Sequence, residues 1–423
     1  MASGWVLQEE SIVCDECDWV NLVPPLLKGE RLKCERCSHV LLSLHQHVNG
    51  RILGFSFSAL LMLAISFVFP FLSFSSKGAQ HTMDLFDTIR ILLGQNYLLM
   101  GSLVCLILIV LPVLYLVSIF HLSWSLKWRR RVPYVQRYLA RWFIVIEPWL
   151  MADVFLVGIL VALVKMSSLA DIELGLSFWA FCAYVVLMVK TVSLVDKRWY
   201  WLQVAGPAKR LPSIQAMPAQ QQGLLGCHFC GATLLKDTTH CYRCRHTVHS
   251  RRPGSLKKTL SYLIAAIVMY IPANIFPIME TTFLGATESS TIMGGVLLLW
   301  SIGSYPVALI IFFASVVIPL AKILSLSWLT WQCYFPTERA TMQKMKLYRL
   351  TELVGRWSMI DIFVVAILTS LVQLGNLISI LPGPAAMSFA SVVLLTMLAA
   401  MVFDPRLLWD KDKGSLGLQE KQR

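Results

Sequence analysis

Eight long apolar segments constrain what this chain can fold into more than any other feature of its sequence. A membrane-spanning helix needs about 20 mostly apolar residues, because it rises about 1.5 Å per residue through about 30 Å of hydrocarbon. The segments cover residues 52–74, 97–120, 149–164, 174–195, 259–279, 305–329, 357–374 and 385–403. Charged residues are only 14% of the chain, whereas soluble domains carry about 25%. The sequence therefore predicts an all-α polytopic membrane protein with eight transmembrane helices.

Lys and Arg residues are divided unevenly among the segments that connect these runs. Of 37 such residues, 32 lie in one set of connections, and only Lys77 and Arg90 lie in the alternate set. The basic set comprises residues 1–51, 121–148, 196–258, 332–356 and 404–423. Because basic loops stay on the cytoplasmic side of a membrane, we expect both termini in the cytoplasm. This orientation accounts for the net charge of +13, so we expect no nucleic-acid partner.

The second half of the chain repeats landmarks of the first half at a nearly constant offset of 207 or 208 residues. The matching pairs are Phe69 with Phe276, Pro70 with Pro277, Pro112 with Pro319, Asp153 with Asp361, and Arg198 with Arg406. We therefore predict two tandem four-helix repeats of the same topology, related by an axis along the membrane normal. The shared prolines predict kinked or broken helices.

Eight of the eleven cysteines occur as Cys-x-x-Cys pairs. They form two clusters, one before each half: Cys14, Cys17, Cys34 and Cys37, then Cys227, Cys230, Cys241 and Cys244. A short pair points two thiolates at one ion, and a second pair completes a tetrahedron. Four thiolates leave no open coordination position. The spacing therefore predicts two small cytoplasmic zinc ribbons, each with one structural zinc ion.

Other interpretations of the cysteines stay open at this point. Disulfides or redox pairs are disfavoured in the cytoplasm, and iron in a rubredoxin-like site is the chemical alternative to zinc. His228, His240 or His246 could replace a cysteine in the second cluster.

Together these features divide the chain into five predicted parts. They are an N-terminal zinc ribbon at 1–50, a first four-helix transmembrane domain at 51–201, a linker and second zinc ribbon at 202–254, a second four-helix transmembrane domain at 255–410, and a tail at 411–423. Segments 85–97 and 292–304 are too short to span, so we place them at the periplasmic face. The Asp-x-Arg-x-x-Trp segments at 196–201 and 404–409 are interpreted as anchors at the membrane interface.

Polar side chains interrupt some of the predicted spans, and a charge in the membrane is costly unless it is paired or functional. Ser315 and Lys322 are seven residues apart and share one helix face, and Ser358 and Asp361 are three apart and share another. With Thr396 in the last span, they predict an intramembrane polar network that handles lipid or protons.

The first half lacks two members of this set. Tyr115 stands where the second half has Lys322, and Met188 stands where it has Thr396. We therefore place the site in the second half. The alternative is a purely structural ion pair between Lys322 and Asp361.

Several longer segments carry a resemblance to a known family. They are Tyr-Ile-Pro-Ala-Asn-Ile-Phe-Pro at 270–277, Leu-Trp-Ser-Ile-Gly-Ser-Tyr-Pro at 299–306, Gly-Arg-Trp-Ser-Met-Ile-Asp at 355–361 and Phe-Asp-Pro-Arg at 403–406. With the cysteine pairs and the tandem halves, they resemble the paraquat-inducible protein A family of bacterial inner-membrane proteins. The resemblance covers nearly the whole chain, and the five polar residues match the family by position.

The resemblance implies a function that no single motif carries. It implies an inner-membrane subunit that works with a periplasmic mammalian-cell-entry domain protein, joined in many systems by an outer-membrane lipoprotein. The implied activity is transport of phospholipids between membranes, which supports the envelope under stress.

Two other functions fit the residues alone. A secondary transporter would export small toxic solutes, and a membrane-anchored sensor would respond to redox state or metal through the cysteines. No phosphate loop, metalloprotease helix or nucleophile elbow occurs in the sequence, so we do not expect an enzyme.

Overall fold

The computed structural model describes the chain in eleven stretches, and every structural statement below concerns these residues. They are 11–24, 29–43, 48–76, 79–94, 98–128, 133–166, 171–206, 215–283, 286–335, 341–371 and 378–410. Fifteen α-helices within them are joined by short strands and turns. The chain is mainly helical, as predicted, but it is not all-α.

The helices of the two halves follow the same order. The first half has α1 (Val48–Ile65), α2 (Leu85–Gly94), α3 (Leu98–Cys105), α4 (Leu111–Lys127), α5 (Pro133–Ile146), α6 (Ala152–Met166), α7 (Leu176–Leu194) and α8 (Lys197–Ala205). The second half has α9 (Ser255–Ile275), α10 (Ile292–Ser301), α11 (Tyr305–Phe312), α12 (Ile318–Tyr334), α13 (Thr341–Gly355), α14 (Ile360–Leu371) and α15 (Pro384–Val402). From α1 and α9 onward, corresponding helices begin 207 or 208 residues apart.

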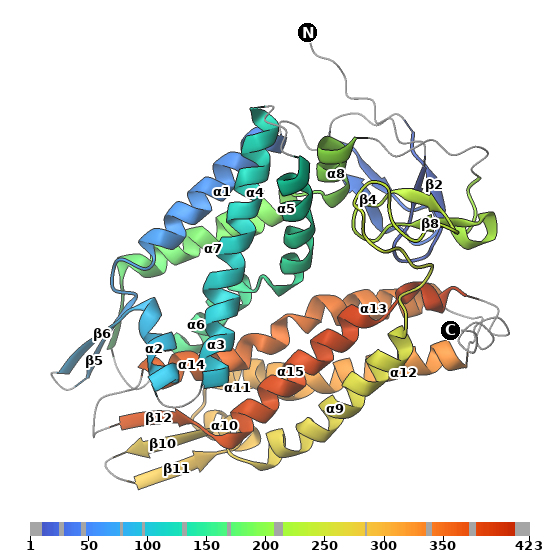
Figure 1. Cartoon of the computed structure of the whole chain (residues 1–423). Helices are drawn as coiled ribbons and strands as arrows, with labels where there is room; N and C mark the ends of the chain where they lie inside the picture. Colours follow the sequence, from blue (N-terminus) through green and yellow to red (C-terminus); the bar gives the residue numbers. More distant parts are fainter. Residues whose placement is uncertain are drawn as a thin grey trace.

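The two halves meet where α6 packs on α14 (Figure 1). Phe155 of α6 and Phe363 of α14 are equivalent in the sequence repeat, and their rings lie edge to face with centroids 5.2 Å apart. Gly158 allows this close approach, since a Cβ there would lie 3.2 Å from the Cβ of Phe363. The interface thus brings together residues at equivalent positions of the two halves.

Two three-stranded antiparallel sheets lie at one end of the molecule, and the cysteine ribbons lie at the other (Figure 1). The first sheet has the order β6-β5-β7, and the second has the order β11-β10-β12. Their strands are β5 (Leu72–Ser76), β6 (Ala79–Met83), β7 (Asp171–Leu174), β10 (Met279–Phe283), β11 (Ala286–Ser290) and β12 (Ile378–Pro382). These strands were not predicted from the sequence. The first strand of each sheet, β5 or β10, begins at the end of an apolar run that the preceding helix occupies.

The ribbons are built from short hairpins. The first ribbon has β1 (Ser11–Val13) paired with β2 (Val20–Leu22), and β3 (Arg31–Lys33) paired with β4 (Val40–Ser43). The second ribbon has β8 (Leu224–Gly226) paired with β9 (Thr233–Leu235).

Pro112 and Pro319 distort equivalent helices in the same way. A proline has no N–H to offer to the carbonyl four residues earlier. A π-turn precedes each proline, at Leu106–Val110 and at Phe313–Val317. In each turn the residue directly before the proline donates its N–H to the carbonyl oxygen five residues earlier, from Leu111 to Leu106 and from Ile318 to Phe313. The kinks predicted at these prolines are therefore π-turns inside long helices.

Seven helical stretches of the described chain are long and apolar enough to cross a membrane, and each overlaps a predicted span. The third begins earlier than predicted, at Val135, because α5 continues through a short 3₁₀ turn into α6. The predicted span at 357–374 corresponds to α14, which has only 12 residues. Residues 372–377 lie outside the described stretches.

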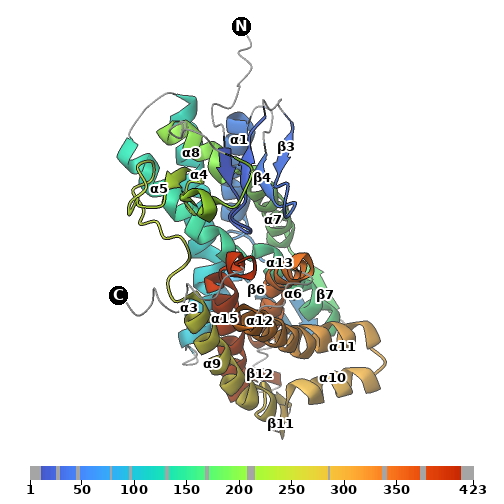
Figure 2. The same cartoon turned by 90° about the vertical axis from the view of Figure 1, so that its right-hand side faces the viewer.

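The two short helices α2 and α10 are packed differently. In the first half α2 packs on α14 across the interface between the halves. In the second half α10 packs mainly on α11, and Figure 2 shows the two helices side by side at the edge of the molecule. Their predicted location at the periplasmic face stays a prediction.

Candidate functional site

A turn that occurs four times brings the cysteines of each ribbon together. In each turn the N–H of the first cysteine donates to the carbonyl oxygen of the residue five positions later. The N–H of the residue after the second cysteine donates to the carbonyl oxygen of the first cysteine. In the first turn, Cys14 N lies 2.9 Å from Trp19 O, and Asp18 N lies 3.0 Å from Cys14 O. The residue that follows the second cysteine has a positive φ in all four turns, at Asp18, Ser38, Gly231 and Arg245. This backbone conformation directs both thiols of a turn to the same side.

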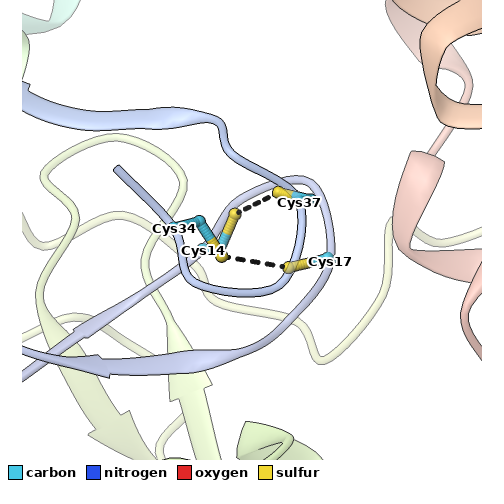
Figure 3. A group of neighbouring side chains, drawn as sticks. All are labelled: Cys14, Cys17, Cys34 and Cys37. Atoms are coloured by element: carbon cyan, nitrogen blue, oxygen red, sulfur yellow. Dashed lines mark hydrogen bonds between the residues drawn. The ribbon is translucent and has the colours of Figure 1, made fainter. Parts of the chain in front are cut away.

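The sulfur atoms in each cluster fit a tetrahedral metal ion. In the first ribbon (Figure 3), Cys14 Sγ lies 3.6 Å from Cys37 Sγ, and Cys17 Sγ lies 3.5 Å from Cys34 Sγ. The corresponding pairs of the second ribbon are both 3.5 Å apart. A zinc ion with bonds of about 2.3 Å would place its sulfurs about 3.8 Å apart, whereas a disulfide would need about 2 Å. The prediction of two four-cysteine clusters that can bind metal is confirmed.

The histidines beside the second cluster make other contacts. Arg406 donates from Nη2 to His228 Nε2 at 2.7 Å. Burial, and then the positive charge of Arg406, lower the pKa of His228 to about 4, so its ring is a neutral acceptor. His246 packs on Phe229 with ring centroids 4.1 Å apart, and His240 contacts Thr239. Within the described residues, each metal-binding group therefore consists of four cysteines.

The two ribbons pack against each other and form one module. Thr233 Oγ1 of β9 donates to Ser11 O of β1 at 3.3 Å. A Cβ at Gly226 would lie 3.0 Å from the Cβ of Val13, so β8 and β1 are in close contact. Ala219 N also donates to Asp18 O at 2.8 Å, which ties the second ribbon to a metal-binding turn of the first.

The segment at 196–201 attaches this module to the first half. Asp196 caps α8, and its carboxylate accepts from Ser43 N at 2.8 Å. Arg198 donates from Nη2 to Asp15 at 3.2 Å. Trp201 is fully buried, so the interpretation of this segment as an interfacial anchor was wrong. Its polar side chains contact the first ribbon, whereas Tyr200 packs on Phe143 of α5 and bonds to Ser123 of α4.

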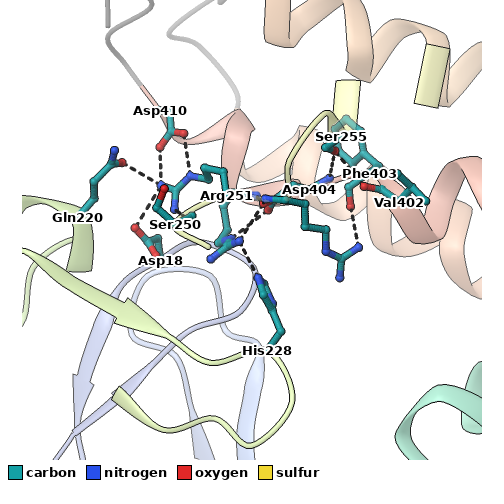
Figure 4. Close-up of polar contacts among 12 residues, drawn as sticks. Asp18, Gln220, His228, Ser250, Arg251, Ser255, Val402, Phe403, Asp404 and Asp410 are labelled. Atoms are coloured by element: carbon teal, nitrogen blue, oxygen red, sulfur yellow. Dashed lines mark hydrogen bonds and ion pairs between the residues drawn. The ribbon is translucent and has the colours of Figure 1, made fainter. Parts of the chain in front are cut away.

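The equivalent segment at 404–409 attaches the module to the second half (Figure 4). Arg406 pairs with Asp404 at 2.8 Å, and both side chains are at least 98% buried. Burial alone would raise the pKa of Asp404, but the Arg406 guanidinium holds that pKa well below its usual range. Nearby, Arg251 contacts both Asp18 at 3.1 Å and Asp410 at 2.7 Å.

Lys322 lies in α12 and is only 2% exposed. Its Nζ lies 3.3 Å from Ser358 Oγ and 3.4 Å from the carbonyl oxygen of Gly355. Ser358 in turn donates to Gly355 O at 2.8 Å. The ammonium group therefore binds at the break between α13 and α14. Gly355 was not among the residues predicted for the polar network, although it lies three residues before Ser358.

The other predicted members of the polar network are placed as follows. Ser315 lies in the π-turn before Pro319 and donates to Ile311 O at 2.7 Å. Thr396 of α15 is buried and donates to Val393 O at 3.0 Å. Asp361 lies in α14, but its side chain is outside the described residues, so its pairing with Lys322 stays a prediction.

Known proteins match the chain along almost its full length. The model of the paraquat-inducible protein A family matches residues 50–205 and again residues 256–412. Intermembrane transport protein PqiA of Escherichia coli (strain K12) is 38% identical over 406 residues, 96% of each chain. Lipophilic envelope-spanning tunnel protein A of the same strain is 30% identical over 94% of this chain and 90% of its own. No solved structure gives a significant match. The chain belongs to the paraquat-inducible protein A family.

Proposed function

We propose that this protein is an inner-membrane subunit of an intermembrane lipid-transport system. It would load or extract lipids at a periplasmic tunnel built from mammalian-cell-entry domains. The observation that carries this proposal is the near full-length match to two Escherichia coli proteins. One is named an intermembrane transport protein and the other a lipophilic envelope-spanning tunnel protein. The match covers both halves, so it goes beyond a single shared membrane module.

The proposed arrangement has eight membrane crossings as two tandem four-helix domains. The ribbons and both termini lie in the cytoplasm, and the two sheets lie in the periplasm. Three observations support it: the Lys and Arg pattern, the placement of ribbons and sheets at opposite ends, and the equivalent helix order of the halves. In this arrangement α14 belongs to the crossing that corresponds to the one made by α6 in the first half.

We propose one structural zinc ion in each cluster. Four buried thiols at tetrahedral spacing and a reducing cytoplasm support zinc, whereas iron would use the same ligands. When bound, the metal supplies a cross-link and no reactive coordination position. We accordingly propose no enzymatic activity for the chain.

The buried polar cluster is proposed to contact a lipid headgroup or to relay a proton during transport. Lys322 supports this role, because a buried ammonium group in a span is costly and binds here only to a hydroxyl and a carbonyl among the described atoms. Asp361 would provide the counter-charge.

Partner and cargo can be tested together. The full-length protein is purified with the periplasmic tunnel protein of the same organism, and the bound lipids are identified by mass spectrometry. The proposal predicts a stable complex that carries phospholipid. An outer-membrane lipoprotein is the proposed third component. Proteoliposomes that show solute-dependent proton flux without the tunnel protein or lipid transfer would favour a secondary transporter instead.

A further inference from the structure

Two arginines at equivalent positions connect the helices to the ribbons in a crossed pattern. Arg141 lies on α5 of the first half, and Arg349 lies 208 residues later on α13 of the second half. Arg141 Nη2 donates to the carbonyl oxygen of Cys244, the last cysteine of the second ribbon. Arg349 Nη2 donates to the carbonyl oxygen of Cys37, the last cysteine of the first ribbon, at 2.8 Å. Each half therefore binds the ribbon that precedes the other half.

The contact made by Arg349 is reinforced by a carboxylate. Its Nε lies 3.0 Å from Glu16 Oε2, and Glu16 also contacts His39 Nδ1 at 3.0 Å. The Glu16 side chain is 12% exposed, so solvent screens this pair only in part. Two parallel donors from one guanidinium fix the angle of the ribbon as well as its distance from α13.

Each ribbon is also held by its own half, through Arg198 to Asp15 in the first and Arg406 to His228 in the second. The own-half and cross-half contacts form a closed loop that runs from the first half through both ribbons to the second half. In Figure 1 the ribbon module accordingly lies beside α5 and above α13. Because the ribbons pack on each other, a rotation of one half would be opposed at both ribbons.

The acceptors of the crossed contacts depend on the metal-binding turns. The carbonyls of Cys37 and Cys244 come directly before Ser38 and Arg245, which have positive φ in the knuckle turns. A bound metal holds the two thiols of each turn and therefore the orientation of these carbonyls. Without metal, the turns lose the cross-link that keeps the carbonyls in place.

We propose that the two ribbons act as one metal-dependent cross-tie that fixes the relative orientation of the transmembrane halves, with Arg141 and Arg349 as its positioning residues. This role goes beyond the proposed function, because it holds for any cargo. During transport, a change in the angle between the halves would require the ribbons either to deform or to lose these contacts.

The test measures the distance between the halves directly. Spin labels are attached to unnatural amino acids at exposed Ser193 on α7 and exposed Ser261 on α9, which leaves all cysteines intact. Pulsed electron resonance on metal-loaded protein in nanodiscs should give one narrow distance distribution. Arg141→Ala with Arg349→Ala should broaden it at least two-fold while the metal content per chain stays that of the unsubstituted protein.

Controls separate the cross-tie from general loosening. Lys346 lies one turn from Arg349, and its exposed side chain has no hydrogen bond or ion pair within the described structure. The Lys346→Ala substitution should therefore leave the distance distribution unchanged. Arg141→Lys with Arg349→Lys keeps one charged donor at each position and should restore most of the narrow distribution. Chelation of the unsubstituted protein should broaden the distribution as much as the double alanine variant does.

Metal removal from the double alanine variant should add no further broadening, because metal and arginines act through the same contacts. A narrow distribution in either the double variant or the chelated protein would overturn the proposal. So would additive broadening, since the metal would then act independently of the arginines. The chelation experiment needs no substitution at the cross-tie, so it decides the question even where the double variant does not accumulate.

Discussion

Gly175→Ala tests the tightest backbone contact in the sheet end of the molecule. Gly175 lies between β7 and α7, and its N–H donates to Phe71 O at 3.1 Å. A Cβ added there would lie 2.0 Å from the carbonyl oxygen of Pro70 and 2.9 Å from the carbonyl carbon. The repeat copies this contact, because a Cβ at Gly383 would lie 2.3 Å from the carbonyl oxygen of Pro277. The φ of Gly175 is −75°, so the clash is steric and not a matter of backbone conformation.

The expected loss of stability follows from the atoms that must move to make room for the added Cβ. Non-bonded carbon contacts are favourable only at about 3.5–4.0 Å, so the backbone would have to shift by more than about 1 Å. Overpacking of a well-packed site costs about 1–3 kcal/mol. The obstacle here is backbone held in a sheet instead of a flexible side chain. We therefore expect Gly175→Ala and Gly383→Ala each to lower stability by about 3 kcal/mol.

The assay is thermal unfolding in detergent, followed by the fluorescence of the 14 tryptophans. Gly54→Ala is the matched control, since a Cβ in that part of α1 meets nothing within 4 Å. Alanine is the better helix former by about 1 kcal/mol, so this control should be neutral or stabilising. An unfolding midpoint for Gly175→Ala equal to that of the unsubstituted protein would show that the backbone at Pro70 yields to the added Cβ without cost.

The metal clusters, the buried segment at 404–409 and Lys322 each give a further prediction. Purified protein should contain about two metal ions per chain by elemental analysis, and Cys227→Ser with Cys230→Ser about one; two ions in that variant would contradict the assignment. Asp404→Asn should lower stability by about 3–5 kcal/mol at neutral pH, because it leaves a buried arginine unpaired. Since the pKa of Asp404 is lowered in the folded protein, the difference in stability between the two proteins should be full above about pH 4. It should shrink as the pH falls through the lowered pKa. Unfolding curves that differ equally at all pH values would count against this prediction. Lys322→Met with Asp361→Leu removes both expected charges, so it should accumulate normally yet fail to complement a deletion strain under detergent stress; full complementation would leave the pair a structural role.

Features encoded by local sequence were predictable. The length of an apolar run is a property of one segment, so seven predicted spans overlap long apolar helices. The Cys-x-x-Cys spacing likewise fixes a turn within a few residues. The two clusters were therefore assigned correctly by residue, although nothing in the sequence pairs Cys14 with Cys37 in space.

Features that depend on distant contacts were not predictable from local patterns. Trp201 and Arg406 have the composition of an interfacial anchor, but both are buried, and only the folded chain brings Arg406 to His228 of the second ribbon. The strand Leu72–Ser76 follows an apolar helix and is itself partly apolar, so no period separates the two. The contacts of Arg141 and Arg349 join positions more than 100 residues apart. Their signal in the sequence was the nearly equal offset of donors and acceptors in the repeat, 208 residues for the arginines and 207 for the cysteines.

Lipid transfer between the inner membrane and a periplasmic tunnel protein is the activity that we propose for this protein. Its most direct test uses proteoliposomes that contain the purified protein and radiolabelled phospholipid, mixed with the purified tunnel protein of the same organism. After the liposomes are removed, labelled phospholipid on the tunnel protein is counted. We expect labelled phospholipid on the tunnel protein well above the level reached with protein-free liposomes. If the two proteins bind each other and the tunnel protein gains no more label than from protein-free liposomes, the claim of lipid transfer is contradicted.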